Sequence, residues 1–401
     1  MPTTCLGRLA TFLLAATFCT AENWPQFRGP RGDGTSLEKF AAPQRELWRT
    51  KLPGPGHSSP IVWGDRIYLT AFERETSITR RIAGNQGRLL VLAIDRKTGR
   101  IEWQHEVTSN EIEKISGVNQ PATPTPATDG ECVYAYFGSF GLVALRADGS
   151  PVWNLPIGPF AHHMGVASSP VISGGRVILN VETDGPSFLY SIDKSTGKPM
   201  WRVPRKTRQA AYATPVVWDR AIVVAGHENV TVYSYDDGRT LWTTSGLSQY
   251  VVPTPVVAKG LLFATSNGPG GNVVMSLGAD GATAWRTSRG GAYVASPVLA
   301  AERLFTVHRN CVVSCLDTRD GRIVWQQRLP TEAECDASPV VAQGRLHVVT
   351  GAGEIFTLEA SDAFRTLGKY ELRENVLASP AISGGAMFVR SNGHLFALES
   401  R

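Results

Sequence analysis

The stretch from Ala93 to Trp103 reads A-I-D-R-K-T-G-R-I-E-W, and it decides the fold. It joins the end of an apolar strand, an Asp, a Thr-Gly turn and a Trp four residues after the glycine. Other copies keep Gly and Trp four residues apart, at Ser191–Trp201, Cys315–Trp325, Gly149–Trp153, Gly238–Trp242 and Gly281–Trp285. A phrase that recurs along a chain indicates a repeat architecture.

A second marker, Ser or Thr followed by Pro and apolar residues, gives the number of repeats. Its eight copies are Ser59-Pro60, Thr125-Pro126, Ser169-Pro170, Thr214-Pro215, Thr254-Pro255, Ser296-Pro297, Ser338-Pro339 and Ser379-Pro380. The prolines follow one another at 40 to 45 residues, except for a first step of 66 that contains the insertion 72–88. Four short apolar runs per repeat, joined by tight turns, are typical of a propeller blade. We therefore predict an all-β, eight-bladed β-propeller of four-stranded antiparallel blades.

The residue types of both markers have physical reasons. Proline cannot donate to a β-ladder, so we place each Ser/Thr-Pro at the innermost strand of a blade, which faces the channel. Glycine provides the positive φ that a hairpin with a bulge needs. We expect each Trp to pack on the neighbouring blade with its indole N–H on a backbone carbonyl. These structural residues are Trp48, Trp103, Trp153, Trp201, Trp242, Trp285 and Trp325. In the seventh repeat Leu367 takes the Trp position, so we expect the weakest contact there.

The two ends of the repeat region complement each other. The last repeat stops at Arg401 before a Trp strand, whereas Glu46–Thr50 is a Trp strand without a preceding repeat. We predict that this N-terminal strand completes the last blade, because joining the ends in one sheet removes an exposed edge.

The first residues indicate export. Arg8, the apolar run Leu9–Phe18 and the small residue Ala21 form the pattern of a secretory signal peptide. We divide the chain into a signal peptide (1–21), an N-terminal extension (22–43) and the propeller (44–401). We expect a periplasmic or extracellular protein; lipidation of Cys19 stays open. No other apolar run is long enough for a membrane span. The net charge of +5 is mild and dispersed, which argues against nucleic acid as a partner. We expect a monomer.

Four cysteines remain after the signal peptide: Cys132, Cys311, Cys315 and Cys335. In an exported protein they allow two disulfides. Cys311 and Cys315 are too far apart along a strand to bond with each other. We expect mostly buried free thiols, with a Cys311–Cys335 bridge as an option.

The phrase A-x-D-x-x-T-G-x-x-x-W resembles the tryptophan-docking motif of the quinoprotein-like, PQQ-repeat propellers, and Ala93–Trp103 matches it in full. The resemblance covers residues 44–401 and implies the eight-bladed fold. Some members are pyrroloquinoline-quinone alcohol or sugar dehydrogenases. Others are non-catalytic, such as the propeller lipoprotein of the outer-membrane β-barrel assembly machine. The stretch Trp24–Gly34 is similar to the leader of secreted propellers of planctomycete-type bacteria, which implies export.

The departures from the dehydrogenase members favour a binding protein. Those enzymes hold the quinone with calcium, Arg and a ring formed by two adjacent cysteines, and this chain has no Cys-Cys pair. We find no other catalytic motif and no metal-ligand spacing. We therefore predict a secreted, non-catalytic propeller that binds a protein or glycan of the cell envelope. The alternative is a dehydrogenase that uses PQQ with calcium.

The candidate binding site follows from the geometry of a propeller. Residues just before each Ser/Thr-Pro should gather at one mouth of the channel, where they are exposed for binding a ligand. They are His57, Gln120, His163, Met164, Tyr212, Tyr250, Tyr293, Asp336 and Asn375, with Arg208 and Arg289 nearby.

Overall fold

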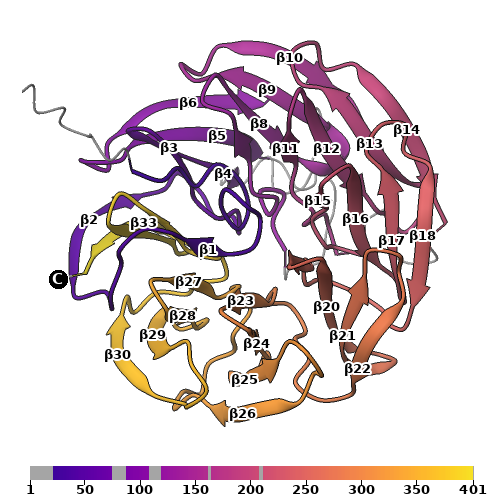
Figure 1. Ribbon diagram of the computed structural model, residues 1–401. Helices are drawn as coiled ribbons and strands as arrows, with labels where there is room; N and C mark the ends of the chain where they lie inside the picture. Colours follow the sequence, from indigo (N-terminus) through magenta and orange to yellow (C-terminus); the bar gives the residue numbers. More distant parts are fainter. Residues whose placement is uncertain (1–20, 75–86, 108–118, 161–163, 207–210, 401) are drawn as a thin grey trace, which may run out of the picture.

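The computed structural model describes residues 21–74, 87–107, 119–160, 164–206 and 211–400. Eight antiparallel four-stranded blades surround a central channel, so the predicted fold is confirmed (Figure 1). The described residues contain one short 3-10 helix, Gly138–Phe140, and no helix that is long and apolar enough to cross a membrane. The predicted signal peptide lies outside the described residues except for Ala21.

Each blade runs from an inner strand at the channel to an outer strand at the rim. Blades 1 to 4 consist of β3 (Ile61–Trp63), β4 (Arg66–Arg74), β5 (Gly87–Asp95) and β6 (Ile101–Val107); β7 (Ala127–Thr128), β8 (Cys132–Tyr136), β9 (Leu142–Arg146) and β10 (Pro151–Leu155); β11 (Val171–Ser173), β12 (Arg176–Val181), β13 (Ser187–Asp193) and β14 (Pro199–Arg205); and β15 (Val216–Trp218), β16 (Ala221–Gly226), β17 (Asn229–Ser234) and β18 (Thr240–Ser245).

Blades 5 to 8 repeat this order, and two strands from the N-terminal region join the last two blades. They consist of β19 (Val256–Ala258), β20 (Leu261–Gly268), β21 (Gly271–Gly278) and β22 (Thr283–Thr287); β23 (Val298–Ala300), β24 (Arg303–Val307), β25 (Val312–Asp317) and β26 (Ile323–Arg328); β27 (Val340–Ala342), β28 (Arg345–Val349), β29 (Glu354–Glu359) and β30 (Thr366–Glu371), with β1 (Thr35–Ser36) beside β27; and β31 (Ala381–Ser383), β32 (Ala386–Arg390), β33 (His394–Glu399) and β2 (Arg45–Lys51).

The ring closes as predicted. The N-terminal strand β2 pairs antiparallel with the C-terminal strand β33, and Trp48 lies opposite Ala397. β2 is therefore the outer strand of blade 8. Beside it, β1 pairs parallel with β27 of blade 7. The chain thus joins its two ends in two neighbouring blades, and β33 is paired on both sides, with β32 and with β2.

The Asp-to-Trp phrase forms a bulged hairpin in contact with the preceding blade. In blade 1 the Asp95 carboxylate accepts hydrogen bonds from the Thr98 N–H and hydroxyl, and Gly99 takes a φ of +74°. The ladder between β5 and β6 shifts register after Ala93. Each outer-strand tryptophan donates its indole N–H to a carbonyl of the following blade, at 2.8–3.2 Å. The pairs are Trp48–Arg96, Trp103–Ala147, Trp153–Lys194, Trp201–Tyr235, Trp242–Ala279, Trp285–Thr318 and Trp325–Ser361.

The turn glycine makes this contact possible. A Cβ at Gly197 would lie 2.6 Å from the Trp153 ring, so only glycine leaves room for the indole. The seventh blade lacks such a glycine, and Phe364 meets the Trp325 ring edge-on at 5.3 Å between centroids. In blade 7 the tryptophan of the preceding blade therefore packs against an aromatic ring, whereas in blades 1 to 6 it packs against the turn glycine.

The position of Leu367 is a correction. The bulge in blade 7 places Gly368, and not Leu367, opposite Thr357 in the register that other blades give to Trp. Leu367 is exposed at the bulge itself. Where the missing indole would lie, the segment between β1 and β2 passes the junction of blades 7 and 8. There Phe40 is wholly buried, and a Cβ on Gly368 would lie 3.0 Å from the Cβ of Ala42.

The hydroxyl groups of the Ser/Thr-Pro marker form a closed ring of hydrogen bonds around the channel. The backbone N–H of each Ser or Thr donates to the hydroxyl of its equivalent in the next blade, at 2.9–3.1 Å. The sequence of donors is Ser59, Thr125, Ser169, Thr214, Thr254, Ser296, Ser338 and Ser379, which returns to Ser59. All eight residues are buried. This ring gives the reason for the hydroxyl group on the residue before each proline. The sequence analysis noted the pattern without that reason.

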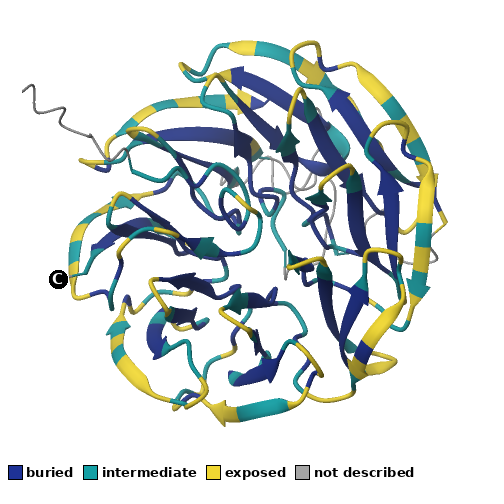
Figure 2. Cartoon of the chain, viewed as in Figure 1, coloured by how far each residue is buried: buried dark blue, intermediate teal, exposed yellow. Residues whose placement is uncertain are grey.

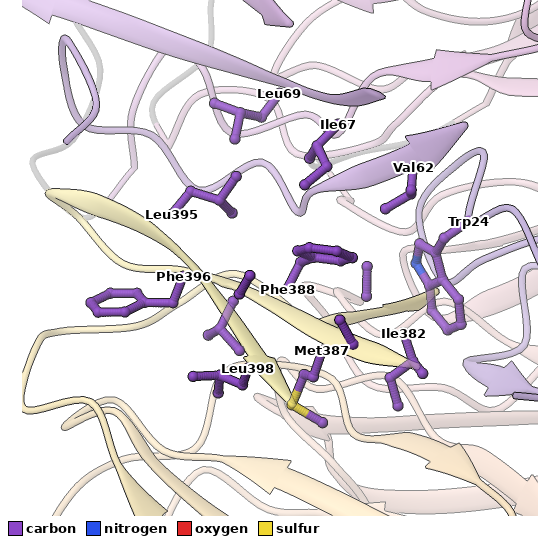
Figure 3. Close-up of a cluster of buried hydrophobic side chains, with 14 of the residues drawn as sticks. Trp24, Val62, Ile67, Leu69, Ile382, Met387, Phe388, Leu395, Phe396 and Leu398 are labelled. Carbon is purple, nitrogen blue, oxygen red and sulfur yellow. The ribbon is translucent and has the colours of Figure 1, made fainter. Parts of the chain in front are cut away.

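The burial of a strand depends on its place in the blade. The two middle strands of each blade are almost wholly buried, whereas most residues of the outer strands are half-buried or exposed (Figure 2). Trp24 from the extension joins the core of blades 1 and 8, where it lies near Val62 and Ile382 (Figure 3). The extension is therefore part of the packed ring.

The cysteines differ from the expectation of mostly free thiols. Cys311 and Cys335 form a disulfide with their Cα atoms 5.1 Å apart, and both residues are wholly buried. The bridge ties the β24–β25 turn of blade 6 to the segment that leads into blade 7. Cys132 and Cys315 are free thiols. The sequence left the bridge as an option, because only the tertiary structure brings the β24–β25 turn beside the segment that carries Cys335.

Candidate functional site

The channel has two ends of different character. At one end, here called the proline-side mouth, the eight Ser/Thr-Pro segments lead into the inner strands. At the other end, the turn-side mouth, the inner strands finish. Here the N-terminal extension lies across several blades. The Pro25 carbonyl accepts from Thr128 N–H of blade 2 at 2.8 Å, and the Gly34 carbonyl accepts from Val341 N–H of blade 7 at 2.9 Å.

Arg28 anchors the extension inside the channel. Its side chain is buried, and its guanidinium donates to the carbonyls of Pro297, Pro339 and Asp33. Burial lowers the pKa of Arg28 to about 10. Gly34 packs on this guanidinium, so a side chain there would displace it. The described part of the extension, residues 21–43, thus covers part of the turn-side mouth.

Three of the tyrosines that the sequence analysis named lie in the segments that lead to the proline-side mouth. Tyr212, Tyr250 and Tyr293 precede the inner strands of blades 4, 5 and 6. Burial, with added repulsion from Asp184 and from the phenols of Tyr250 and Tyr293, raises the pKa of Tyr212. The three rings are therefore electrostatic neighbours. Tyr250 is 37% exposed, and its backbone has a φ of +55°, which is uncommon for a residue with a side chain.

A charged group continues this aromatic sector into blades 6 and 7. The Arg309 guanidinium lies 5.9 Å from the centre of the Tyr293 ring. The same guanidinium lies 2.9 Å from a Glu334 carboxylate oxygen and 3.4 Å from one of Asp336. Burial raises the pKa of Asp336, and Arg309 opposes that effect. The Cys311–Cys335 disulfide joins the segment that carries Arg309 to the segment that carries Glu334 and Asp336.

A second sector of the mouth lies at blades 8 and 1. Arg390 at the end of β32 is wholly buried, and it donates to the carbonyl and hydroxyl of Ser58 and to the Thr70 carbonyl. Burial lowers its pKa to about 9. His57 lies beside it, and burial together with the Arg390 charge lowers the pKa of His57 to about 4. His57 is therefore neutral at physiological pH.

Blade 3 contributes a buried ion pair. Arg205 lies 3.3 Å from Glu182, and both side chains are almost fully buried. Asn180 donates to the same carboxylate at 3.3 Å. A Cβ on Gly226 of blade 4 would lie 2.6 Å from the guanidinium, so glycine is required there. This pair neutralises itself within the blade.

The remaining predicted residues do not all join these sectors. The Met164 carbonyl accepts from the Asn119 side chain at 2.6 Å, and the backbone of Gln120 forms a turn with Thr123. Asn375 and Arg289 are exposed at the surface. His163 and Arg208 lie outside the described residues. The sequence analysis missed Arg309, Glu334, Arg390, Glu182 and Arg205. A charge at the end of an otherwise apolar strand, as at Arg390, was the signal that could have found that residue.

The comparisons with known proteins agree with this architecture. Eight blades with outer tryptophans and a closing N-terminal strand define a quinoprotein-type repeat propeller. The family model described as outer membrane protein assembly factor BamB matches residues 34–185, 164–310 and 309–401. The chain therefore belongs to this family, and the resemblance seen in the sequence is confirmed.

Individual relatives support the same assignment. The chain is 23% identical over 331 residues to outer membrane protein assembly factor BamB of Yersinia pestis, which covers 77% of this chain and 79% of that protein. The crystal structure of BamB from Moraxella catarrhalis has a TM-score of 0.66 and 15% identity, covering 89% of this chain and 98% of that one. A europium-containing methanol dehydrogenase has a TM-score of 0.70 and 11% identity, covering 93% and 90%. At these identities the two structures show the common fold alone.

Proposed function

We propose that this protein is a secreted, non-catalytic propeller that binds a protein partner of the cell envelope through its proline-side mouth. The observation that carries the proposal is the sector of Tyr212, Tyr250, Tyr293 and Arg309 at the proline-side mouth. Tyrosine and arginine are the residues that most often carry the binding energy of protein interfaces. The name of the family, an outer membrane assembly factor, favours an envelope protein as the partner.

The residues of the mouth support binding over quinone chemistry. An anionic quinone needs cationic side chains that are available to its carboxylates. Of the arginines described at or near this mouth, Arg309 and Arg205 are already paired with carboxylates, and Arg390 is wholly buried with its donors turned to Ser58 and Thr70. Arg289 is exposed at the surface and does not join the buried sectors of the mouth. The disulfide joins residues 24 apart and is buried, unlike the ring of two adjacent cysteines that the dehydrogenases use. These residues do not fit the cofactor, and we derive no reaction through it.

The test uses photo-crosslinking from the mouth. A benzoylphenylalanine at Tyr250, in the full chain expressed in its own host, should give a discrete adduct with one envelope protein. The matched control is the same probe at Leu241 on β18, which is similarly exposed at the outer rim. Tyr293→Ala should reduce the adduct from position 250 at least about fivefold, since truncating such an anchor costs more than 1 kcal/mol.

Three outcomes contradict the proposal in different ways. Equal adducts from positions 250 and 241 show contact without a site. A glycan that raises the melting temperature in wild type but not in Tyr293→Ala, with no protein adduct, makes the ligand an envelope glycan. Oxidation of alcohols or aldoses after addition of the quinone and calcium makes the protein a dehydrogenase.

A further inference from the structure

A cavity of about 340 Å³ lies in the channel between the N-terminal extension and the inner strands of blades 3 and 4. Gln26, Phe27 and Arg31 line it from the extension, and Ile172 and Val217 line it from β11 and β15. Its volume lies within the range of small-ligand sites. The extension closes it on the turn side, and its lining reaches Thr214, Pro215 and Thr254 of the Ser/Thr-Pro ring.

The propeller repeat relates this cavity to a site that the chain fills with its own Trp24. Ile172 and Val217 are the middle residues of the inner strands of two neighbouring blades. The residues at the same positions of blades 8 and 1 are Ile382 and Val62. Trp24 packs in the cluster that contains this second pair, as Figure 3 shows. The cavity is therefore the counterpart, three blades further around the ring, of the Trp24 site.

Trp24 is held there as a one-residue strand. Its N–H donates to the Val62 carbonyl and its carbonyl accepts from the Val62 N–H, both at 2.8 Å. Val62 lies opposite Ile67 in the hairpin, next to the pair that flanks the turn. Groups at this register point away from the neighbouring strand, toward the channel. The backbone of Val62 therefore offers one donor and one acceptor, and Trp24 uses both.

Val217 offers the same two groups to the cavity. It lies opposite Ile222, next to the pair Trp218–Ala221 that flanks the turn, so its N–H and carbonyl also point to the channel. The extension satisfies the equivalent N–H groups of Val62, Thr128, Ile172 and Val341. Within the described part of the chain, no group forms a hydrogen bond with the outward N–H or carbonyl of Val217. Val217 is half-buried at the cavity wall, so these two groups are available to a peptide backbone that enters the cavity.

We propose that the cavity binds an extended peptide segment that carries a large aromatic side chain, paired with Val217 as Trp24 is paired with Val62. The aromatic side chain of the peptide packs on Phe27, Ile172 and the valines of β15. The peptide backbone forms hydrogen bonds with the N–H and carbonyl of Val217, as in other cases of β-strand addition. Arg31 at the rim is already paired with Glu22 and Asp33, so the site favours an uncharged part of the peptide over a charged terminus.

The probe for this site is N-acetyl-tryptophanamide, which carries the indole and the two backbone groups of Trp24 with no charge. The full chain labelled with ¹⁵N-valine is titrated and the amide signals are followed by NMR. We expect a saturable shift of the Val217 amide. N-acetylglycinamide should bind at least about tenfold more weakly, because burial of an aromatic side chain is worth more than a tenfold step in affinity.

Two variants separate the site from general effects. Val217→Pro removes the outward N–H without breaking the ladder to β16, and it should abolish binding, which in this variant is followed by the amide of Val216, a second valine of the cavity lining. Val257→Pro makes the same change at the equivalent position of β19, outside the cavity lining, and should bind the probe as wild type does. Ile172→Trp fills the cavity, leaves every backbone donor in place and should also abolish binding, which provides a second check if V217P does not fold.

The proposal is overturned if the Val217 amide does not shift with the probe, because the cavity then holds water only. It is also overturned if Val217→Pro and Val257→Pro weaken binding equally, or if Ile172→Trp leaves binding intact. None of these results bears on the proline-side mouth, so the partner-binding proposal is tested separately.

Discussion

Acid sensitivity of the propeller should depend on one histidine in the core of blade 7. His347 on β28 is wholly buried, with Nδ1 3.0 Å from the Thr357 hydroxyl. Its ring meets Phe40 edge-on at 5.4 Å between centroids. Burial, with a smaller contribution from Arg345, lowers the pKa of His347 to about 3. The neutral imidazole is therefore the form that the folded protein accepts.

The sign and size of the effect follow from linkage. In the unfolded chain histidine titrates at a pKa of about 6.5, so between about pH 6.5 and pH 3 the unfolded state binds the extra proton. The free energy of unfolding therefore decreases as the pH falls through this window, by about 1.4 kcal/mol per pH unit. At pH 4.5 the loss attributable to His347 is about 2.7 kcal/mol, and at pH 7 it is close to zero.

His347→Phe provides the comparison, since the equivalent residues of blades 5, 6 and 8 are phenylalanines (Phe263, Phe305 and Phe388). Denaturant unfolding of wild type and variant is measured at pH 7 and pH 4.5. Carboxylates and His57 titrate in both proteins and cancel in the difference. We expect the wild type to lose about 2–3 kcal/mol more than the variant between the two pH values. The reasoning is refuted if both proteins lose the same amount to within about 0.5 kcal/mol.

Further predictions concern the ring itself. Ser338→Ala leaves the buried Ser296 N–H without its acceptor and should lower the free energy of unfolding by about 1–3 kcal/mol, whereas Ser338→Thr, the residue that other blades use, should be nearly neutral. Equal denaturant midpoints for the two variants would show that the hydroxyl ring does not stabilise the fold. Trp285→Ala, at the most buried of the outer tryptophans, should cost about 3–5 kcal/mol, and an unchanged melting curve would refute its docking role. Cys335→Ser should lower the free energy of unfolding by about 3.5 kcal/mol, because the unfolded chain is no longer restricted by the bridge. In denaturant unfolding, a reductant should destabilise the wild type and leave the variant unchanged. Deletion of residues 44–50 should abolish cooperative unfolding, measured by calorimetry, because β33 then becomes an edge strand; a melting temperature that barely moves would contradict closure through β2.

The candidate site was only partly accessible to prediction. The offset before each Ser/Thr-Pro placed Tyr212, Tyr250 and Tyr293 at one mouth, because strand direction alone determines which end of a blade a residue reaches. The same rule gave no means to select which mouth residues act together. Arg309 contacts Tyr293 because the β24–β25 turn of blade 6 reaches the segment that leads into the inner strand of the same blade, and Asn375 stays at the surface although it has an equivalent position.

The sequence by itself determined the number of blades, the bulged Asp-Gly hairpins and the closing role of β2. These features depend on local patterns, namely strand period, turn residues and a missing strand at each end. Only the tertiary structure decided the Gly368 register, the Glu182–Arg205 pair, the Cys311–Cys335 bridge and the path of the extension. Each of these depends on which distant groups meet across neighbouring blades or across the channel. Arg28, for example, finds its partners at Pro297 and Pro339, more than 260 residues away, and no local pattern records such a contact.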